Sequence, residues 1–362
     1  MTENVFVRQE GGLGRITLNR PEALHALNLD MCHAITAALR DWASDDGVHM
    51  VLVDHADQTR GFCAGGDIVM LRDSGLRDGA QARAFFAEEY RMNAMIKAFP
   101  KPYLAIMDGV TMGGGVGLSV HGTDRVATER TVFAMPETGI GLFPDVGGGW
   151  FLPRLRGELG TWLALTGARL KGGDVVAAGI ATHFIPSELI PNLKVQLVNA
   201  DLSAGAAELL GVVLRSMSRP VPDAEFAAHM EEINTCFAGD RAEDIRDRLL
   251  ASGSDWARAQ GDVLMQKSPE TVKVALRQLR LGRVCASFSE NMAMEYRIGW
   301  RKVQSHDFIE GVRAVVIDKD HRPNWSPSSL EAVRDADIEM FFQSLGEDEL
   351  VLPAISSVKF TK

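Results

Sequence analysis

The feature that most constrains the fold is the run Gly113–Gly117, in which four of five residues are glycine. It follows Tyr103–Met107, an apolar segment typical of a buried strand. Glycine lacks a Cβ and tolerates positive φ, so a turn here can bring bare backbone N–H groups against a ligand. A second apolar strand, Val48–Val53, precedes another glycine-rich loop at Phe62–Asp67. Strand, glycine turn and helix thus occur twice, which predicts repeated ββα-like units in mixed α/β layers.

Hydrophobic periodicity predicts the elements around these turns. Val5–Arg8 and Arg15–Leu18 flank a glycine-rich stretch, a pattern typical of a β-hairpin. Apolar residues at helical spacing predict helices at Asp30–Trp42 and Ala82–Phe99. We therefore expect an α/β fold for residues 1–190.

Helical patterns dominate after about Pro191, until the segment Val315–Trp325, which is predicted to be extended and rich in turns. A chain of 362 residues is long for one compact domain. We therefore expect residues 191–362 to form a second, helical region that packs over the core and covers the functional site. The helices predicted there are Leu193–Leu202, Ala204–Ser216, Asp223–Phe237, Ala242–Leu250, Trp256–Gln266, Pro269–Leu281 and Ser289–Val303.

Composition excludes several classes of partner. The net charge is −10 and no cluster of Lys and Arg stands out, which argues against nucleic acid or an anionic membrane as the main partner. No apolar stretch reaches the roughly 18–20 residues of a membrane span. No His, Cys, Asp and Glu residues have metal-ligand spacing, so we expect no metal site. The four cysteines are scattered and no signal peptide is visible, so we expect free thiols and a cytoplasmic protein.

Two isolated acids follow the glycine run. Glu137 comes after Pro136 among apolar residues, where loss of hydration would raise the pKa of its carboxyl and suit a base or nucleophile. A helix cap or a salt bridge is the alternative interpretation. Asp145 could equally cap a helix near Trp150. Bare amides beside acids suggest acyl chemistry, in which the amides hold an oxyanion and an acid handles the proton or attacks.

Other short motifs in the chain do not match known functional sites. A dinucleotide-binding fingerprint is excluded because Leu118 stands where its third glycine belongs. The string around Ser119 nearly matches a nucleophile elbow, but His121 replaces its last glycine. Glu88 and Glu89 are adjacent acids in a predicted helix, a pattern typical of a solvated face.

The motifs taken together resemble the enoyl-CoA hydratase/isomerase (crotonase) superfamily over roughly the first 190 residues. The finer resemblance is to its 3-hydroxyisobutyryl-CoA hydrolase branch, which the helical second half and Ile317–Asp320 also resemble. The segments that carry the resemblance are Asn19–Pro21, Gly61–Asp67, Gly109–Gly117, Met135–Glu137, Thr111–Gly122, Phe143–Gly149 and Phe151–Leu155.

This resemblance implies a crotonase-like ββα spiral core that binds an acyl-CoA thioester. It implies that the backbone N–H groups of Gly66 and Gly114 form an oxyanion hole. It implies that Glu137 matches the second catalytic glutamate of the hydratases, while the first falls on Gly117 and is missing. It places the adenine and ribose of CoA at the segment around His25, Ala26, Ala64 and Asp67.

The missing acid matters chemically. Adding water across a double bond with two acids needs both carboxylates, whereas one carboxylate and an oxyanion hole can open a thioester. In the hydrolase branch, Glu137, Asp145 and Glu89 match positions that contact substrate. We assign Asp145 to orient the substrate hydroxyl or the water, and Glu89 to line the acyl pocket.

The resemblance therefore implies hydrolysis of a short 3-hydroxyacyl-CoA, best 3-hydroxyisobutyryl-CoA in valine breakdown. Glu137 either attacks the thioester to form a mixed anhydride or activates water directly, and the sequence leaves both routes open. CoA enters as part of the substrate, and no separate cofactor is expected. An enoyl-CoA hydratase or isomerase and a non-catalytic acyl-CoA-binding scaffold are the alternatives. Whether the chain forms a homo-oligomer is left open.

Overall fold

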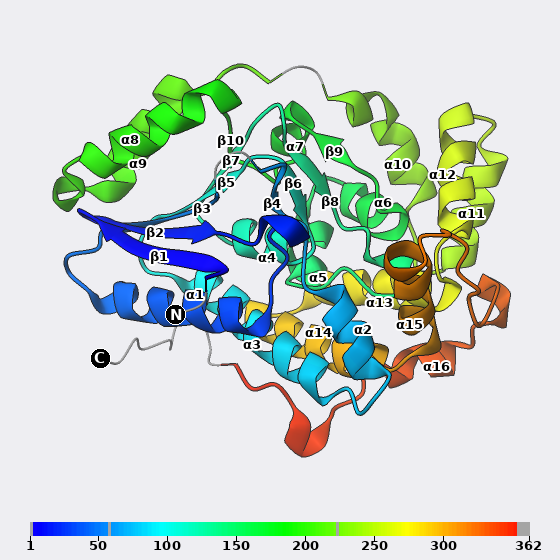
Figure 1. Cartoon of the computed structure of the whole chain (residues 1–362). Coiled ribbons are helices and arrows are strands. Elements are labelled where there is room, and N and C mark those ends of the chain that lie inside the picture. Colours follow the sequence, from blue (N-terminus) through cyan, green and yellow to red (C-terminus); the bar gives the residue numbers. More distant parts are fainter. Residues whose placement is uncertain (1–2, 57–58, 222–223, 353–362) are drawn as a thin grey trace.

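The computed structural model describes residues 3–56, 59–221 and 224–352, and two sheets organise it (Figure 1). A six-stranded sheet has the order β1-β2-β3-β5-β7-β10, and a four-stranded sheet has the order β4-β6-β8-β9. Only the pairs β1–β2 and β8–β9 are antiparallel among the described pairings. The strands are β1 Val5–Glu10, β2 Leu13–Leu18, β3 Met50–His55, β4 Gly61–Cys63, β5 Tyr103–Met107, β6 Val110–Met112, β7 Asp124–Ala127, β8 Val132–Ala134, β9 Leu170–Lys171 and β10 His183–Phe184.

The chain winds between the two sheets in successive ββα turns. The first strand of each turn (β3, β5, β7) enters the large sheet, and the second (β4, β6, β8) enters the small one. Parallel neighbours need a crossover, and the helices and loops between the turns provide it. The repeated ββα units predicted from the glycine turns are therefore confirmed. The helices that follow are α1 Leu29–Ser44, α2 Ile68–Gly75, α3 Ala80–Ala98, α4 Gly114–Ser119, α5 Gly148–Phe151, α6 Leu159–Thr166 and α7 Gly173–Ala177.

The region after residue 190 is helical, as predicted. Its helices are α8 Ile190–Asn199, α9 Ala206–Met217, α10 Met230–Cys236, α11 Ala242–Ala251, α12 Asp255–Met265, α13 Pro269–Val284, α14 Phe288–Lys302, α15 His306–Val312 and α16 Asp335–Met340.

Two predictions in this region are wrong in detail. The helix expected at 223–237 begins at a residue outside the described ones, and its described part is a 3₁₀ segment, Glu225–His229, followed by α10. The chain leaves helical geometry at His229 (φ −109°, ψ 7°). The segment expected to be extended from Val315 begins instead with a π-helical turn, Arg313–Ile317, that continues α15. The N–H of Asp318 donates to the carbonyl of Arg313 at 2.8 Å and closes that turn.

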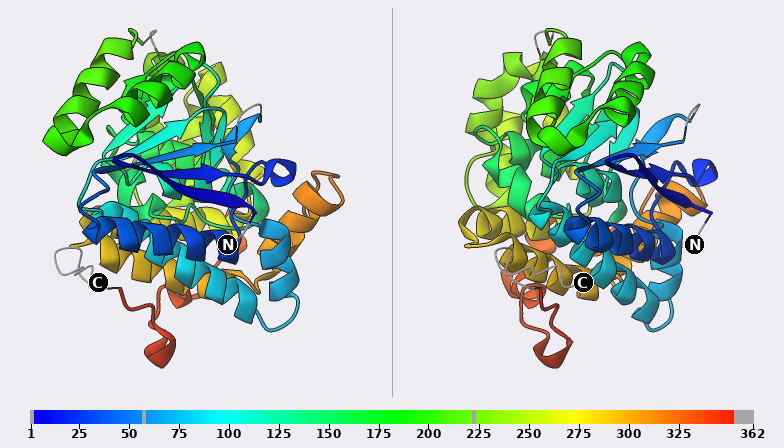
Figure 2. Two further views of the ribbon diagram at one scale, coloured as in Figure 1. Left: turned by 60° about the vertical axis from the view of Figure 1, so that its left-hand side comes forward. Right: turned by 90° about the vertical axis from the view of Figure 1, so that its left-hand side faces the viewer.

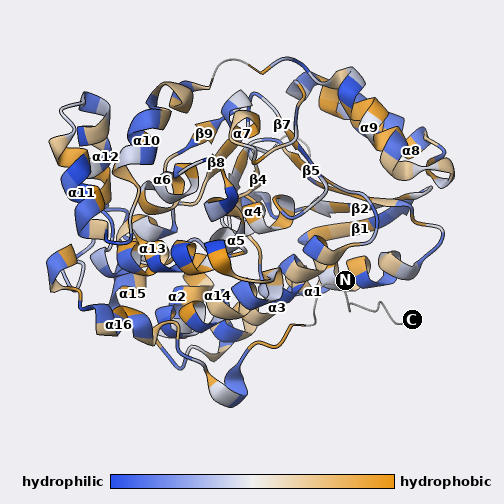
Figure 3. Ribbon diagram, turned by 180° about the vertical axis from the view of Figure 1, so that it is seen from behind, coloured by the Kyte–Doolittle hydropathy of each residue, from blue (hydrophilic) through white to orange (hydrophobic). Residues whose placement is uncertain are grey.

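Helices α8 and α9 cover the outer face of the large sheet (Figure 2). Both helices are amphipathic, with hydrophilic and hydrophobic residues side by side in Figure 3. Their apolar side chains share one buried cluster with sheet residues, including Leu193 and Leu197 from α8, Leu210 and Leu214 from α9, and Leu52 and Leu104 from the sheet. These two helices therefore belong to the sheet face, although they follow residue 190.

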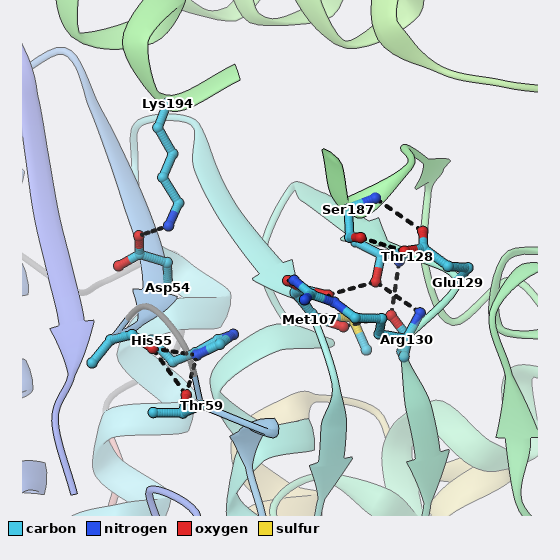
Figure 4. A network of polar contacts seen from close by, with 12 residues as sticks. Asp54, His55, Thr59, Met107, Thr128, Glu129, Arg130, Ser187 and Lys194 are labelled. Atoms are coloured by element: carbon cyan, nitrogen blue, oxygen red, sulfur yellow. Dashed lines mark hydrogen bonds and ion pairs between the residues drawn. The ribbon is translucent and has the colours of Figure 1, made fainter. Parts of the chain in front are cut away.

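An ion pair at the carboxyl end of β3 fastens α8 to the sheet (Figure 4). The Lys194 ammonium lies 2.7 Å from the Asp54 carboxylate, and Arg15 donates to the same carboxylate at 2.8 Å. Burial alone would raise the pKa of Asp54, but Lys194 and Arg15 outweigh it and hold the pKa below its usual value. The pair therefore stabilises the folded state at neutral pH.

Helices α13 and α14 lie on the opposite side, packed against α3 and α5 (Figure 1). Their buried residues join the main apolar cluster of the core, among them Leu276, Leu279, Met292 and Ile298.

Among the described residues, none of the helices has the length and apolar character that a membrane span needs. All four cysteines carry free thiols, as predicted.

The two faces of α8 provide a test of this packing. Leu193→Ala should lower the free energy of unfolding by about 2–5 kcal/mol, because the leucine is fully buried against the sheet. Val195→Ala on the same helix, where the side chain is 57% exposed, should change it by less than about 0.5 kcal/mol. Urea unfolding of both variants measures the difference. Equal losses would contradict the placement of α8.

Candidate active site

Three neighbouring strand ends build the site. The strands β4, β6 and β8 are adjacent and parallel, so their carboxyl ends meet at one edge of the small sheet. Gly66 lies three residues past the end of β4, Gly114 two past β6, and Glu137 three past β8. The edge of a parallel sheet is where ligands commonly bind. Sheet order thus brings together residues that are far apart in sequence.

A cavity of about 780 Å³ opens at this edge. Ala64, Gly66, Gly114, Glu89, Glu137 and Asp145 all line it. This volume falls in the range of small-molecule sites. The cavity wall also includes Phe85, Phe86, Met112, Ile140, Leu142, Arg169, Lys267, Val315, Arg322 and Trp325.

Glu89 and Glu137 both lie over the turn formed by Gly113 and Gly114. A Cβ on Gly114 would stand only 2.6 Å from Oε1 of Glu89, and one on Gly113 would stand 3.3 Å from Oε1 of Glu137. Gly113 also has φ +46° and ψ −120°, a conformation that side chains disfavour. Glycine is therefore required here for two reasons, close approach and backbone geometry.

The backbone amides of Gly66 and Gly114 have no protein acceptor among the described residues. The isolated bridge between Leu27 and Gly66 uses the N–H groups of Leu27 and Asp67, so the amide of Gly66 is left out of it. The N–H of Gly114 lies in the first turn of α4, where helical amides lack intrahelical partners. Both amides are thus available to a ligand in the cavity.

Three carboxyl groups share this cavity. Glu89, Glu137 and Asp145 are 2%, 4% and 5% exposed. Burial raises the pKa of Glu137 well above its usual value, and repulsion from Asp145 raises it further. Burial, then Asp145 and Glu137, raise the pKa of Glu89 in the same way. Burial also raises the pKa of Asp145 to about 7, although a hydrogen bond from the Tyr90 hydroxyl pulls it down.

Two of these carboxyl groups keep an oxygen free. Oε1 of Glu89 and Oε2 of Glu137 are buried and have no hydrogen-bond partner among the described residues. Buried polar atoms without a partner are rare in folded proteins, and at a cavity wall they point to a polar ligand. A carboxyl group with a raised pKa and a free oxygen can accept a proton or attack a carbonyl carbon.

Asp145 is positioned by Tyr90 rather than by a helix. The Tyr90 hydroxyl donates to Oδ2 of Asp145 at 3.0 Å. The residue that precedes α5 is Gly147, so the interpretation of Asp145 as a cap of this helix is wrong. Tyr90 was missed at the sequence level, although it directly follows Glu89 in α3. The expectation that Glu88–Glu89 forms a solvated face is wrong for Glu89, which is buried.

The residues expected to hold adenine and ribose are more dispersed. Ala64 lines the cavity, whereas His25, Ala26 and Asp67 do not. The His25 ring is buried, accepts the backbone N–H of Arg20 at 2.9 Å and contacts the Thr59 hydroxyl at 2.9 Å. Asp67 caps α2 and binds Arg20 at 2.8 Å. The carbonyl of Leu24 accepts from the Ala64 amide at 3.0 Å, so this segment nevertheless abuts the cavity wall.

Ser119 has no catalytic geometry. Its hydroxyl is buried and donates to the carbonyl of Gly115 at 2.9 Å, within its own helix. The near match to a nucleophile elbow is therefore structural. Within residues 3–56, 59–221 and 224–352, no group of three or more His, Cys, Asp and Glu side chains could hold a metal ion.

Comparison with known proteins identifies the family. The sequence model of the enoyl-CoA hydratase/isomerase family matches residues 13–342, and the chain belongs to this family. The chain is 47% identical over 353 residues to the mitochondrial 3-hydroxyisobutyryl-CoA hydrolase of Rattus norvegicus, covering 96% of this chain and 91% of that protein. It is 45% identical over 353 residues to the Homo sapiens protein of the same name, covering 96% and 90%.

Solved structures place the fold. A carnitinyl-CoA dehydratase from Mycobacterium thermoresistibile matches with a TM-score of 0.90 and 38% identity, over 97% of this chain and 99% of that one. An enoyl-CoA hydratase from Rhodobacter sphaeroides matches with a TM-score of 0.87 and 39% identity, over 97% and 100%. The chain has the crotonase fold, as its motifs implied.

The prediction of a cytoplasmic protein is overturned by these comparisons. The curated relatives that cover 96% of the chain are named as mitochondrial enzymes. Free thiols suggested a reducing compartment, but thiols stay reduced in more than one compartment. Cysteine usage therefore did not determine location.

The buried carboxyls make a prediction about stability and pH. The native pKa of Asp145 is about 7 against an ordinary 3.8, so the native state holds the proton more tightly than the unfolded chain. Stability is then lost as pH rises from about 4 to 7. Asp145→Asn removes this loss. Relative to the unmodified protein, the variant should therefore gain roughly 1–3 kcal/mol more free energy of unfolding at pH 8 than at pH 5.

Asp54→Asn is the control, because the pKa of Asp54 is lowered rather than raised. It should destabilise the protein at pH 8. Urea unfolding at the two pH values measures both variants. A gain for Asp145→Asn that does not grow between pH 5 and pH 8 would contradict the raised pKa.

Proposed function

We propose that the chain hydrolyses a short 3-hydroxyacyl-CoA thioester, with 3-hydroxyisobutyryl-CoA as its favoured substrate and 3-hydroxyisobutyrate and CoA as products. The observation that carries this proposal is the buried carboxyl group of Glu137, which has an unpartnered oxygen and shares one cavity with two unpartnered amides. The curated relatives at 45–48% identity, which are named as hydrolases of this thioester, support the same substrate. Breakdown of valine is the pathway that this substrate implies.

The thioester carbonyl oxygen binds to the amides of Gly66 and Gly114, which stabilise the negative charge that develops on it. In one route Glu137 attacks the carbonyl carbon, the C–S bond breaks, and CoA leaves as a thiolate that takes up a proton. Water then cleaves the mixed anhydride. In the other route Glu137 takes a proton from water, which attacks the carbonyl carbon directly. Both routes need Glu137 ionised when the attack begins.

Asp145 and Glu89 handle the acyl end in this proposal. Asp145, held by the Tyr90 hydroxyl, orients the 3-hydroxyl group of the substrate or the attacking water. The free oxygen of Glu89 lies above Gly114 and lines the acyl pocket. A short, hydroxylated acyl group suits a pocket that mixes these acids with the phenylalanines at 85 and 86.

The cationic side of the cavity fits CoA. Arg169 and Lys267 line it, and within the described residues neither side chain has a carboxylate partner. Burial lowers the pKa of Lys267, and repulsion from Arg169 lowers it further. Two neighbouring cations without an acid favour an anionic ligand, and CoA supplies phosphate groups.

The alternative of a hydratase or isomerase draws on the names of the two solved structures. The local packing speaks against it. A Cβ on Gly117 would stand 2.7 Å from Nδ2 of Asn93 and 2.8 Å from Cβ of Val146. The position that matches the first hydratase glutamate therefore has no room for a side chain. Release of free CoA separates the hydrolase from both the hydratase and the non-catalytic scaffold.

Glu137→Gln tests the central role. The glutamine keeps the size of the side chain but can neither attack nor take a proton, so kcat should fall by about 10³-fold or more. Binding of CoA should change little, because the amides and the cations remain. A thiol-release assay over a panel of acyl-CoA thioesters measures both the loss and the substrate preference of the unmodified protein. Near-normal hydrolysis by this variant would remove Glu137 from the mechanism.

Crotonyl-CoA tests the missing acid. Because Gly117 supplies no carboxylate, hydration of crotonyl-CoA should be negligible beside release of CoA from the best thioester. Loss of the enoyl absorbance measures hydration, and a thiol reagent measures release in the same sample. Hydration as fast as thioester hydrolysis would reject the proposed activity in favour of a hydratase.

A further inference from the structure

A buried glutamate of the C-terminal region reaches the loop that carries Asp145. Glu295 lies on α14, which packs against α5 and α3, and its side chain is completely buried. It does not line the cavity. No step of the proposed reaction uses it, and a buried carboxyl group that only packs is unfavourable. Its contacts explain why it is there.

Both oxygens of Glu295 accept hydrogen bonds from the junction between this loop and α5. Oε2 accepts the backbone N–H of Gly147 at 2.7 Å, and Oε1 accepts that of Gly149 at 2.9 Å. The side-chain amides of Asn291 and Gln278 also donate to Oε1, at 2.8 and 3.2 Å. Charged or polar acceptors of backbone amides fix loop geometry strongly when they are buried.

The loop needs such support because its backbone is strained. Val146, directly after Asp145, has φ +51°, and Gly147 has φ +88°. A β-branched residue with positive φ is a genuine outlier. Such conformations persist only when surrounding contacts over-determine them, and they gather at functional sites.

Other contacts reach the same loop from outside. The carbonyl of Pro144 accepts from Gln278 at 2.7 Å, and that of Val146 contacts Nε2 of His121 at 2.7 Å. These two contacts hold carbonyl groups, whereas Glu295 holds N–H groups. Glu295 accepts two backbone N–H groups that lie two residues apart, directly after Val146.

We propose that Glu295 is a positioning residue for thioester hydrolysis, which holds the strained 144–147 loop and the first turn of α5 so that Asp145 meets the Tyr90 hydroxyl and the substrate. This inference rests on the proposed function of the cavity. The helical C-terminal region thus supports the site through hydrogen bonds to the backbone, in addition to lining the cavity with residues such as Lys267 and Trp325.

Glu295→Gln tests the proposal. In either orientation of the glutamine side chain, its NH₂ group faces one of the two backbone N–H groups that donate to Glu295 in the unmodified protein. The buried amide of Gly147 or Gly149 then loses its acceptor, the loop relaxes and Asp145 shifts. We expect kcat to fall about tenfold or more, while KM and the affinity for free CoA change less than about twofold.

Glu243→Gln is the matched control. Glu243 is also a buried glutamate with an ionic partner, the half-buried ammonium of Lys273 at 2.5 Å, but it belongs to α11 and touches no part of the loop. Its kcat per folded molecule should stay unchanged. An unchanged kcat in Glu295→Gln, or equal losses in the two variants after correction for the folded fraction, would overturn the positioning role.

Hydrogen exchange provides a readout that does not depend on activity. The amides of Gly147 and Gly149 should exchange faster in Glu295→Gln than in the unmodified protein, while those of β5 and β7 keep their rates. Unchanged exchange at the two glycines rejects the role of Glu295. An unmodified protein that releases no CoA rejects the proposed function instead, so the two failures are distinguishable.

If Glu295→Gln does not fold, Asn291→Ala is the second variant. It removes one donor to Oε1 of Glu295, the oxygen that accepts the Gly149 N–H, and so loosens the hold of the carboxylate on that amide. A smaller loss of kcat in the same direction supports the proposal. No loss of kcat and no change of exchange in this variant would overturn it.

Discussion

The structure depends on keeping three buried carboxyl groups at one cavity. Such groups repel one another, and burial removes the hydration that stabilises their charge. The chain does not neutralise them with adjacent cations, since no Lys or Arg among the described residues shifts the pKa of Glu89, Glu137 or Asp145. It accepts a cost in stability at this site, and the large apolar clusters on both faces of the main sheet offset that cost. The pKa of Asp145, which burial raises to about 7, reflects this cost.

Bare backbone is the counterpart of the acids. Each of the three strand ends that reach the cavity carries glycine or proline, and none of these residues places a bulky side chain in the way. A polar group can therefore come close to these amides, as Oε1 of Glu89 does at Gly114. Charge stabilisation thus comes from fixed dipoles, which cost no reorganisation during a reaction.

Local patterns were enough to predict much of the fold. Helical spacing located α1 and α3 within two residues at each end, and the two glycine turns indicated the repeated ββα units. The resemblance implied Glu89 and Asp145 at the cavity, and both line it. Their roles stay predictions. Periodicity failed where a short-range contact decided the geometry, as at the π-helical turn after α15.

Residues that act through others were not predictable from the chain. Tyr90 and Glu295 lie on helices, where an aromatic or an acid is common, and nothing in their local pattern indicates a partner. Glu295 stands 150 residues from Asp145 along the chain, and only the packing of α14 against α5 brings it to the loop. Long-range contacts of this kind leave no periodic signal. The position of α8 and α9 was missed for the same reason, because their apolar faces fit either the sheet or the cavity rim.

The closed space around Gly117 has a consequence for how this family diversifies. Installing a second acid there requires Asn93 and Val146 to give way first, because both already occupy the volume that a side chain would enter. A single substitution is therefore blocked by its neighbours, and the order of mutations matters. Two enzymes with the same backbone can then lie several coupled steps apart, so overall identity is a poor measure of how readily one chemistry gives rise to the other.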